Sequence, residues 1–371
     1  MLSSLEIKNF RTFSHLFIER LGRVNLVVGK NNVGKTTLLE ALRLYGSIWP
    51  RSTIASILHE RNEVAGSAEG KTVLLFPSLF HGRQAQEGDE ISIREVAGGE
   101  SPHAFSAVAR AEKEPTSAAD MFEAVAAGLV LDVSWPGRKF TLRADGSASY
   151  AIASKSPKPP EVSPDPPCLR GVGIQCPVED MIADWWDGFA LTEAEQRVVA
   201  ALQIIAPIRG VRFIGDPRSD RGRTARVRVD GISEPVALAS QGDGLVRMFQ
   251  IAAAMEYAAV RARQASSADP GLPNVFPLLL IDEIEVGIHH TLHADLWGFI
   301  FSAARLLDVQ VFATTHSWDC LKGFAEAVKG DDQADGLAIR LERIEGKKQT
   351  GAVIIDRDDL PIVLRDSIEV R

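Results

Sequence analysis

A glycine-bounded loop, GKNNVGKT at residues 29–36, constrains the fold of this 371-residue chain more than any other feature. It follows the apolar strand pattern VNLVV and precedes a helical pattern with Leu38, Leu39 and Leu42 on one face. Gly, four residues, Gly, Lys and Thr form the P-loop pattern, in which backbone N–H groups at a helix N-terminus cradle phosphates. The sequence therefore predicts an α/β P-loop NTPase fold, with a mixed sheet flanked by helices.

The side chains of this loop have predicted roles. Lys35 is expected to neutralise β- and γ-phosphate oxygens of ATP and so to act in catalysis, and Thr36 to offer its hydroxyl to Mg²⁺. Gly34 allows the backbone to turn toward the phosphates. The predicted nucleotide-binding residues of the loop are Asn31, Asn32, Gly34, Lys35, Thr36 and Thr37.

Two adjacent carboxylates, Asp282 and Glu283, end the apolar run FPLLLIDE. An acid at the tip of a buried strand can hold Mg²⁺, and an acid beside it can polarise an attacking water. We therefore predict Asp282 and Thr36 as the metal-binding residues and Glu283 as the catalytic base. His316 follows another buried-strand pattern, VQVFATT, and is predicted either to reach the γ-phosphate in catalysis or to be a hydrogen-bonded structural residue.

The segment SQGDGLVR opens a long helical pattern and supplies Ser240, Gly242 and Gly244. A serine hydroxyl and backbone N–H groups at a helix start can bind an anion, although the same residues can form an ordinary helix cap. Because this segment lies between the P-loop and the FPLLLIDE strand, we predict Ser240 and Gly242 as a second phosphate-contacting element.

The motifs divide the chain into three parts. Residues 1–50 are predicted to form one ATPase lobe with the P-loop, and residues 168–371 the other, with the later motifs. Strand-like runs between Gly, Ser and Ala stretches predict an inserted mixed α/β lobe at 51–167, which a proline-rich connection ends. Residues 16–29 are predicted to form a hairpin that leads into the P-loop strand.

Composition limits the setting. The net charge of −8 means that nucleic acid or an anionic membrane could be contacted only through a local basic patch. The three cysteines show no metal-ligand spacing, which suits a reducing compartment. The N-terminal residues match no signal or transit peptide and no apolar run could span a bilayer, so a cytoplasmic protein without membrane contact is expected.

Taken together, these motifs resemble the ABC-type ATPase heads of the SMC/RecF group. The resemblance is closest to the OLD-like ATPases of bacteria, often described as AAA-family ATPases. It covers residues 1–50 and about 185–325, and rests on five motifs: KNFRTF, GKNNVGKTT, SQGDGL, LLLIDEIEVGIHH and FATTHS.

The resemblance implies a homodimer, or a higher homo-oligomer, with ATP between the subunits. Ser240 of one subunit would then meet the γ-phosphate held by Lys35 of the other. It further implies that Arg11 lies near the nucleotide, that Gly287 belongs to a loop at the dimer interface, and that His316 is a switch histidine.

Three departures limit this resemblance. The signature reads SQGDG, which fits OLD-like proteins better than the LSGGQ of transporters, and neither Gln84 nor Gln86 can be assigned as the Mg²⁺-sensing glutamine. The chain also leaves no room after His316 for the Toprim nuclease domain of OLD proteins. A separate effector protein, such as a Toprim-type nuclease in an anti-phage system, is therefore the expected partner.

Other functions stay open. Seven arginines crowd the hairpin pattern before the signature segment and could track a DNA backbone, as in a RecF-like repair ATPase, or could pair with surplus acids. ATP could instead assemble a scaffold or sensor whose turnover is incidental. A small-molecule kinase fits the carboxylate pair and the Ser240 segment less well.

Overall fold

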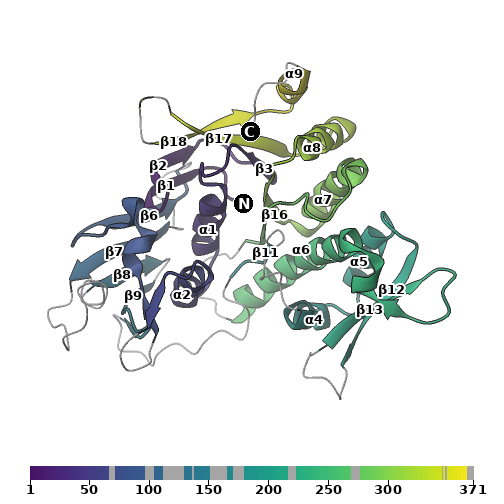
Figure 1. The fold of residues 1–371 in the computed structure, drawn as a ribbon, viewed down its shortest axis with the longest axis horizontal. Coiled ribbons are helices and arrows are strands. Elements are labelled where there is room, and N and C mark those ends of the chain that lie inside the picture. The colour runs from purple at the N-terminus through teal and green to yellow at the C-terminus, as the bar shows by residue number, and fades with distance from the viewer. Residues whose placement is uncertain are drawn as a thin grey trace.

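The computed structural model describes residues 1–66, 72–96, 104–111, 129–135, 138–150, 165–169, 179–215, 223–268, 276–344, 346 and 349–365. Two sheets dominate these residues, one mainly parallel and one antiparallel (Figure 1).

The mainly parallel sheet has six strands in the order β11-β15-β16-β3-β17-β18. Their bounds are β3 Val24–Val28, β11 Cys168–Leu169, β15 Leu278–Ile281, β16 Gln310–Thr314, β17 Gly336–Arg343 and β18 Thr350–Ile355. Neighbouring strands are parallel except for β17 and β18. Strands β3, β15 and β16 are buried along their whole length, which explains why each reads as a nearly continuous apolar run.

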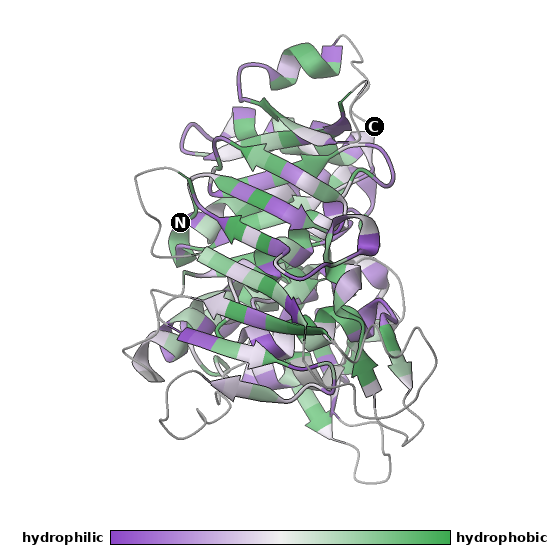
Figure 2. Cartoon of the chain, turned by 90° about the vertical axis from the view of Figure 1, so that its left-hand side faces the viewer, coloured by the Kyte–Doolittle hydropathy of each residue, from purple (hydrophilic) through white to green (hydrophobic). Residues whose placement is uncertain are grey.

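The antiparallel sheet has seven strands in the order β10-β9-β8-β7-β6-β1-β2. Their bounds are β1 Leu5–Phe10, β2 Phe13–Ile18, β6 Glu90–Arg94, β7 Ala104–Ala111, β8 Leu129–Trp135, β9 Arg138–Leu142 and β10 Ala148–Tyr150. Hydrophilic and hydrophobic residues alternate along these strands (Figure 2), and in β7 buried positions alternate with half-buried ones. Such alternation is expected of a sheet with one face on the core.

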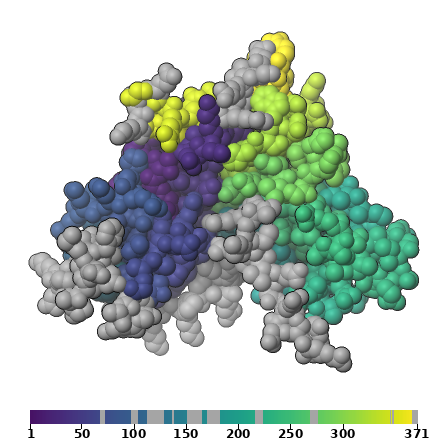
Figure 3. Space-filling view, viewed as in Figure 1, coloured from purple at the N-terminus to yellow at the C-terminus, as the bar shows by residue number. Residues whose placement is uncertain are grey.

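Helix α1 (Lys35–Tyr45) packs between the two sheets, with α2 (Pro50–Glu60) beside it (Figure 1). Leu38 and Leu42 of α1 are buried together with Ile7 and Ile93 of the antiparallel sheet and Phe312 of the parallel sheet. In the space-filling view the purple N-terminal residues accordingly lie between the blue and the light green parts of the chain (Figure 3). The first turn of α1, which carries the P-loop lysine, is therefore anchored to both sheets.

A second core lies on the other face of the parallel sheet, against the long helix α6 (Asp243–Ala268). Helices α7 (His293–Leu307) and α8 (Trp318–Gly330) cover the same face, and α4 (Glu179–Asp187) and α5 (Glu193–Leu202) pack on α6 (Figure 1). A three-stranded sheet, β12 (Ile208–Gly215), β13 (Arg223–Val229) and β14 (Val236–Ala237), leads into the 3-10 turn η3 (Leu238–Gln241) and then α6.

The remaining elements are short. They are β4 (Val64–Gly66), β5 (Thr72–Leu74), η1 (Phe76–Leu79), η2 (His81–Arg83), η4 (His290–Leu292) and α9 (Leu360–Arg365). In the described part of the chain, no helix has both the length and the apolar character that a membrane span requires.

The predicted α/β fold with a mixed sheet flanked by helices is confirmed, but the predicted hairpin at residues 16–29 is wrong. Strand β2 pairs with β1 in the antiparallel sheet, whereas β3 pairs with β16 and β17 in the parallel one. Residues 51–167 supply strands β6–β10 of the sheet that β1 and β2 begin, with β1 pairing directly with β6. The segment predicted as an inserted lobe thus shares a sheet with residues 1–50.

Candidate nucleotide site

The three predicted catalytic segments meet at one edge of the parallel sheet. Strands β15, β16 and β3 are consecutive and parallel, so their carboxyl ends lie at the same edge. The P-loop follows β3, Asp282 and Glu283 follow β15, and His316 follows β16. Ligands of open α/β sheets bind beyond the carboxyl ends of the strands, so this edge is the candidate site.

The P-loop is ordered by its own lysine. Lys35 is 6% exposed, and its Nζ donates to the carbonyl oxygens of Gly29 at 2.6 Å and Lys30 at 2.9 Å. Burial lowers the pKa of Lys35, opposed by the negative charges of Asp282, Glu283 and Glu285. The ammonium is therefore held inside the loop by the loop's own carbonyl oxygens.

Glycine is required at Gly34, where φ is 108° and an added Cβ would lie 2.6 Å from the ring of Phe13. The hydroxyl of Thr37 lies 3.3 Å from that of Thr12, which ties α1 to the β1–β2 turn. Asn31 and Asn32 are exposed at the tip of the loop. Their predicted contacts with nucleotide, like that of Thr37, stay predictions.

Asp282 is held by two hydroxyl groups. Thr36 Oγ1 donates to Asp282 Oδ2 at 3.1 Å, and Thr314 Oγ1 donates to Asp282 Oδ1. A carboxylate and a hydroxyl oxygen side by side are hard ligands of the kind that Mg²⁺ takes, so the pair predicted from sequence fits this ion. Thr314 was not predicted as a site residue, although its position at the carboxyl end of a buried strand, β16, could have indicated it in the sequence.

Glu283 has a left-handed backbone, with φ of 51°. Its N–H donates to Thr314 Oγ1 at 2.9 Å, and its carbonyl oxygen accepts from Arg247 Nη2 at 3.3 Å. The same Nη2 atom donates to the carbonyl oxygen of Asp282 at 3.0 Å. Arg247 is 5% exposed within α6 and was not predicted, because its position in a long helix gives no sequence signal. It links the signature helix to the backbone of the proposed base.

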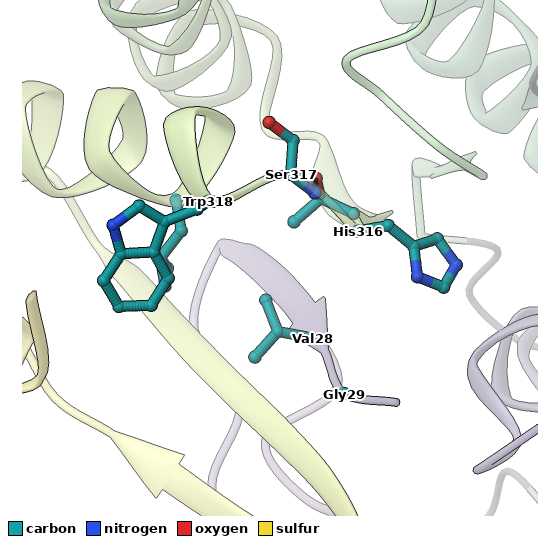
Figure 4. Close-up of a pocket in the computed structure, with 7 residues that line it drawn as sticks. Val28, Gly29, His316, Ser317 and Trp318 are labelled. Atoms are coloured by element: carbon teal, nitrogen blue, oxygen red, sulfur yellow. Dashed lines mark hydrogen bonds between the residues drawn. The ribbon is translucent and has the colours of Figure 1, made fainter. Parts of the chain in front are cut away.

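His316 is positioned through its backbone. Its N–H donates to Glu285 Oε1 at 2.9 Å, while its side chain is exposed. His316 lines a small pocket with Gly29 and Trp318, and Figure 4 shows its ring pointing away from that of Trp318, with Val28 and Gly29 at the end of β3 nearby. Glu285 therefore joins the loop after β15 to the loop after β16.

The signature segment is exposed. Ser240 Oγ donates to the carbonyl oxygen of Ala237 at 2.7 Å within the η3 turn, and Gly242 has φ of 96°. An added Cβ on Gly244 would lie 3.0 Å from the carbonyl oxygen of Gly287, so the start of α6 packs tightly on the loop after the carboxylate pair.

Arg11 is buried beside α1. Its side chain is 8% exposed, and its Nε lies 2.8 Å from Glu40 Oε2. Its Nη1 donates to Glu63 Oε1 at 3.0 Å, and its Nη2 lies 2.8 Å from Glu63 Oε2. Contact of Arg11 with nucleotide stays a prediction.

Family models match two segments of the chain. Residues 1–47 match a family described as an AAA ATPase domain, and residues 187–319 match one described as an AAA domain, putative AbiEii toxin, type IV toxin–antitoxin system. The fold is that of a P-loop NTPase, and the two matched segments are each similar to an AAA-type ATPase domain.

Three curated relatives match shorter stretches. The chain is 33% identical over 93 residues to an ATP/GTP phosphatase of Helicobacter pylori, covering 24% of each chain. It is 49% identical over 41 residues to the DNA replication and repair protein RecF of Clostridioides difficile, 11% of each chain. It is also 47% identical over 45 residues to an uncharacterized protein of Methanocaldococcus jannaschii, 12% of this chain and 20% of that one. The matches thus span a quarter or less of each relative.

Solved structures of SMC heads align along most of the chain. One, bound to the C-terminal winged-helix domain of ScpA, covers 96% of this chain and 97% of that one at 12% identity, with a TM-score of 0.49. Another, bound to the C-terminal domain of ScpA from Pyrococcus furiosus, covers 99% of both at 12% identity, with a TM-score of 0.47. These alignments are long but loose.

Proposed function

We propose that this chain is an Mg²⁺-dependent ATPase that dimerises around ATP and thereby regulates a separate effector protein. The observation that carries the proposal is the convergence of Lys35, Thr36, Asp282, Glu283 and His316 at one sheet edge. A P-loop without a carboxylate pair would suit a protein that binds ATP but does not hydrolyse it. The carboxylate pair Asp282 and Glu283, which Thr314 and Arg247 hold by hydrogen bonds, suits ATP hydrolysis.

Each residue has one task in this mechanism. Lys35 moves from its loop carbonyls to the β- and γ-phosphate oxygens, and Thr36 and Asp282 hold the metal. When bound by Thr36 and Asp282, Mg²⁺ would supply positive charge to offset the charge that develops on the phosphates. Glu283 accepts the proton of the attacking water, and His316 orients that water or the γ-phosphate.

Dimerisation is proposed for the signature segment. Ser240 is exposed and its hydroxyl is engaged only within its own turn, so it is free to rotate toward a ligand held by a second copy of the chain. The description of one matching family as a putative toxin of a toxin–antitoxin system supports a two-component role. A nuclease as effector and a role in anti-phage defence rest on the resemblance to OLD-like ATPases, and the cytoplasm is proposed as the compartment because the three cysteines suit a reducing one.

The test compares wild type with Glu283→Gln, which removes the base but keeps its shape. Light scattering with and without Mg-ATP gives the mass, and phosphate release gives the turnover. We expect the variant to lose about 10²- to 10⁴-fold in turnover and to accumulate as an ATP-bound dimer. Unchanged mass in both proteins would refute dimerisation. If output of the effector were the same for both proteins, the scaffold alternative would be favoured instead.

A DNA-responsive ATPase is the second candidate, and one observation favours it. Arg212 and Arg226 lie directly opposite each other on β12 and β13, and both are exposed together with Arg228. Like charges at cross-strand positions are destabilising unless an anion lies between them. In contrast, Arg209 pairs with Asp230 and Arg223 with Asp187.

The arginine ribbon Arg212, Arg226 and Arg228 can be tested by changing all three residues to Gln. If duplex DNA binds to these arginines, the variant binds DNA more weakly. The slope of log affinity against log salt concentration also falls by the amount expected for the loss of about three phosphate contacts. The matched control changes Arg209 and Arg223, which already have acidic partners. Equal loss in both variants would point to general charge and not to this ribbon.

A further inference from the structure

Arg61 lies just after α2, and its side chain contacts the helix whose first turn carries Lys35 and Thr36. Its Nε donates to Glu40 Oε1 at 2.7 Å, and its side chain is 38% exposed. Among the described residues, Glu40 is its one polar partner. The two terminal amino groups of the guanidinium therefore keep their four N–H donors for another ligand.

The position of Arg61 follows from the spacing of α1. Thr36 and Glu40 are four residues apart, so they are neighbours on one face of the helix. Thr36 donates to Asp282, and Glu40 accepts from Arg61 one turn further along. The Arg61 guanidinium is therefore attached to α1 one turn beyond Thr36, whose hydroxyl contacts the carboxylate that is proposed to hold the metal.

The direction of the pKa shift of Arg61 agrees with its position near α1. Burial lowers the pKa of Arg61, but the charge of Glu40 and its hydrogen bond, followed by the charges of Glu63 and Asp282, outweigh burial and raise the pKa. Asp282 is therefore near enough to stabilise the positive charge of Arg61.

The surrounding ion cluster holds more arginines than carboxylates. Glu40 pairs with Arg11 and Arg61, and Glu63 pairs with Arg11 and Arg83. Three arginines thus share two carboxylates, and Arg11 is buried while the other two are partly exposed. The excess positive charge lies on the exposed pair, and of these Arg61 is the one attached to the α1 face that carries Thr36.

We propose that Arg61 is a nucleotide-binding residue whose terminal amino groups contact phosphate oxygens on the side marked by Thr36 and Asp282. The inference rests on the proposed binding of ATP by the P-loop. A guanidinium fork matches a phosphate better than an ammonium does, and Glu40 orients this fork from behind. We expect this contact to select ATP over ADP, because a metal held by Thr36 and Asp282 would offset charge on the γ-phosphate, which ATP carries and ADP lacks.

The test measures binding of Mg-ATPγS and Mg-ADP to wild type, Arg61→Gln and Arg61→Lys by competition with a fluorescent nucleotide. We expect Arg61→Gln to weaken ATPγS about tenfold or more and ADP by less than about threefold, as befits one charge-assisted contact. Arg61→Lys should recover part of the loss, because it keeps the charge but not the fork. The matched control is Arg83→Gln, which lies in the same cluster and should stay within about twofold of wild type.

Folding is monitored by thermal unfolding of each variant. Glu40 keeps Arg11 as its partner when Arg61 is changed, so the melting temperature should shift little. Equal affinities of Arg61→Gln and wild type would overturn this inference while leaving ATP binding intact. A parallel loss for both nucleotides, with a lower melting temperature, would assign Arg61 a structural role and overturn it as well. If wild type binds neither nucleotide, the proposed function itself fails.

Discussion

The nucleotide edge of the parallel sheet and the signature segment differ in how far the chain alone completes them. At the edge, Lys35 is bonded to two loop carbonyls, and both oxygens of Asp282 accept hydroxyl donors. In the signature segment, Ser240 is exposed and donates only to its own turn. The groups at the sheet edge already contact one another within the chain, whereas the signature segment has an exposed hydroxyl that another molecule can reach.

This difference indicates where rigidity and where association are needed. Lys35 and Asp282, which are proposed to act in the chemistry, are hydrogen-bonded between neighbouring segments of the fold, so mutation there should disturb folding too. Groups that would meet another molecule can stay exposed and cost the fold little. Perturbing the two regions should therefore separate effects on activity from effects on stability.

The largest expected effect is that of Lys35→Ala. Loss of the ammonium should lower kcat/KM about 10³-fold, because a charged contact to the transferred phosphate is removed. It should also destabilise the fold by about 1–2 kcal/mol, since the carbonyl oxygens of Gly29 and Lys30 lose their donor. Phosphate release measures kcat/KM, and thermal unfolding measures the change in stability. A fall in kcat/KM of less than tenfold would contradict the interpretation that this edge of the sheet is an assembled catalytic site.

Thr314→Val should have the next largest effect, because valine keeps the shape of threonine but removes the hydroxyl between Asp282 and the Glu283 N–H. Loss of such an outer partner typically costs 10- to 100-fold in metal affinity or activity. Turnover measured against Mg²⁺ concentration should show a raised metal requirement. The matched control is Thr315→Val, whose hydroxyl accepts from Ser317 N and contacts neither acid; equal effects would assign Thr314 to folding alone.

Ser240→Ala should separate the two regions most clearly. We expect turnover at low protein concentration to fall about tenfold, from loss of one charge-assisted contact. Stability should stay within about 0.5 kcal/mol of wild type, as for other exposed positions. Ser233→Ala, also exposed, is the control. Unchanged turnover at all concentrations would remove Ser240 from the active assembly.

The smallest effect is expected for Gly244→Ala at the junction of the two regions. Alanine favours the helix by about 1 kcal/mol, but its Cβ would lie 3.0 Å from the carbonyl oxygen of Gly287. The gain from helix preference and the cost of the close contact should nearly cancel in the free energy of unfolding. Displacement of the loop that contains Gly287 should lower turnover about two- to fivefold. Gly298→Ala in α7, which has no atom within 4 Å of the added Cβ, should gain the full helix term with turnover unchanged.

The sequence was most informative where the local pattern alone decides the structure. The P-loop and the buried runs before Asp282 and His316 predicted both their strands and their shared edge, because parallel strands place their ends together. The local sequence pattern did not predict which strands pair with each other. The alternating residues of β2 and the apolar run of β3 are adjacent in sequence, but no local signal says that they enter different sheets.

Side chains that act across elements were also missed. Arg247 donates to the carbonyl oxygen of Asp282 from α6, and Arg61 donates to Glu40 from the end of α2. Each looks like an ordinary surface arginine in the sequence. Their roles depend on packing between segments that are distant in the chain. Thr314 lay within a quoted motif, yet its value depends on β16 being the neighbour of β15.

The backbone of Glu283 carries an evolutionary consequence. A residue other than glycine held at φ of 51° costs roughly 1–2 kcal/mol, and glycine at this position would relieve that cost. A glycine, however, would delete the carboxylate proposed as the base. The position thus embodies a trade-off between stability and function, because the substitution that would make the protein more heat-resistant here would also remove its turnover.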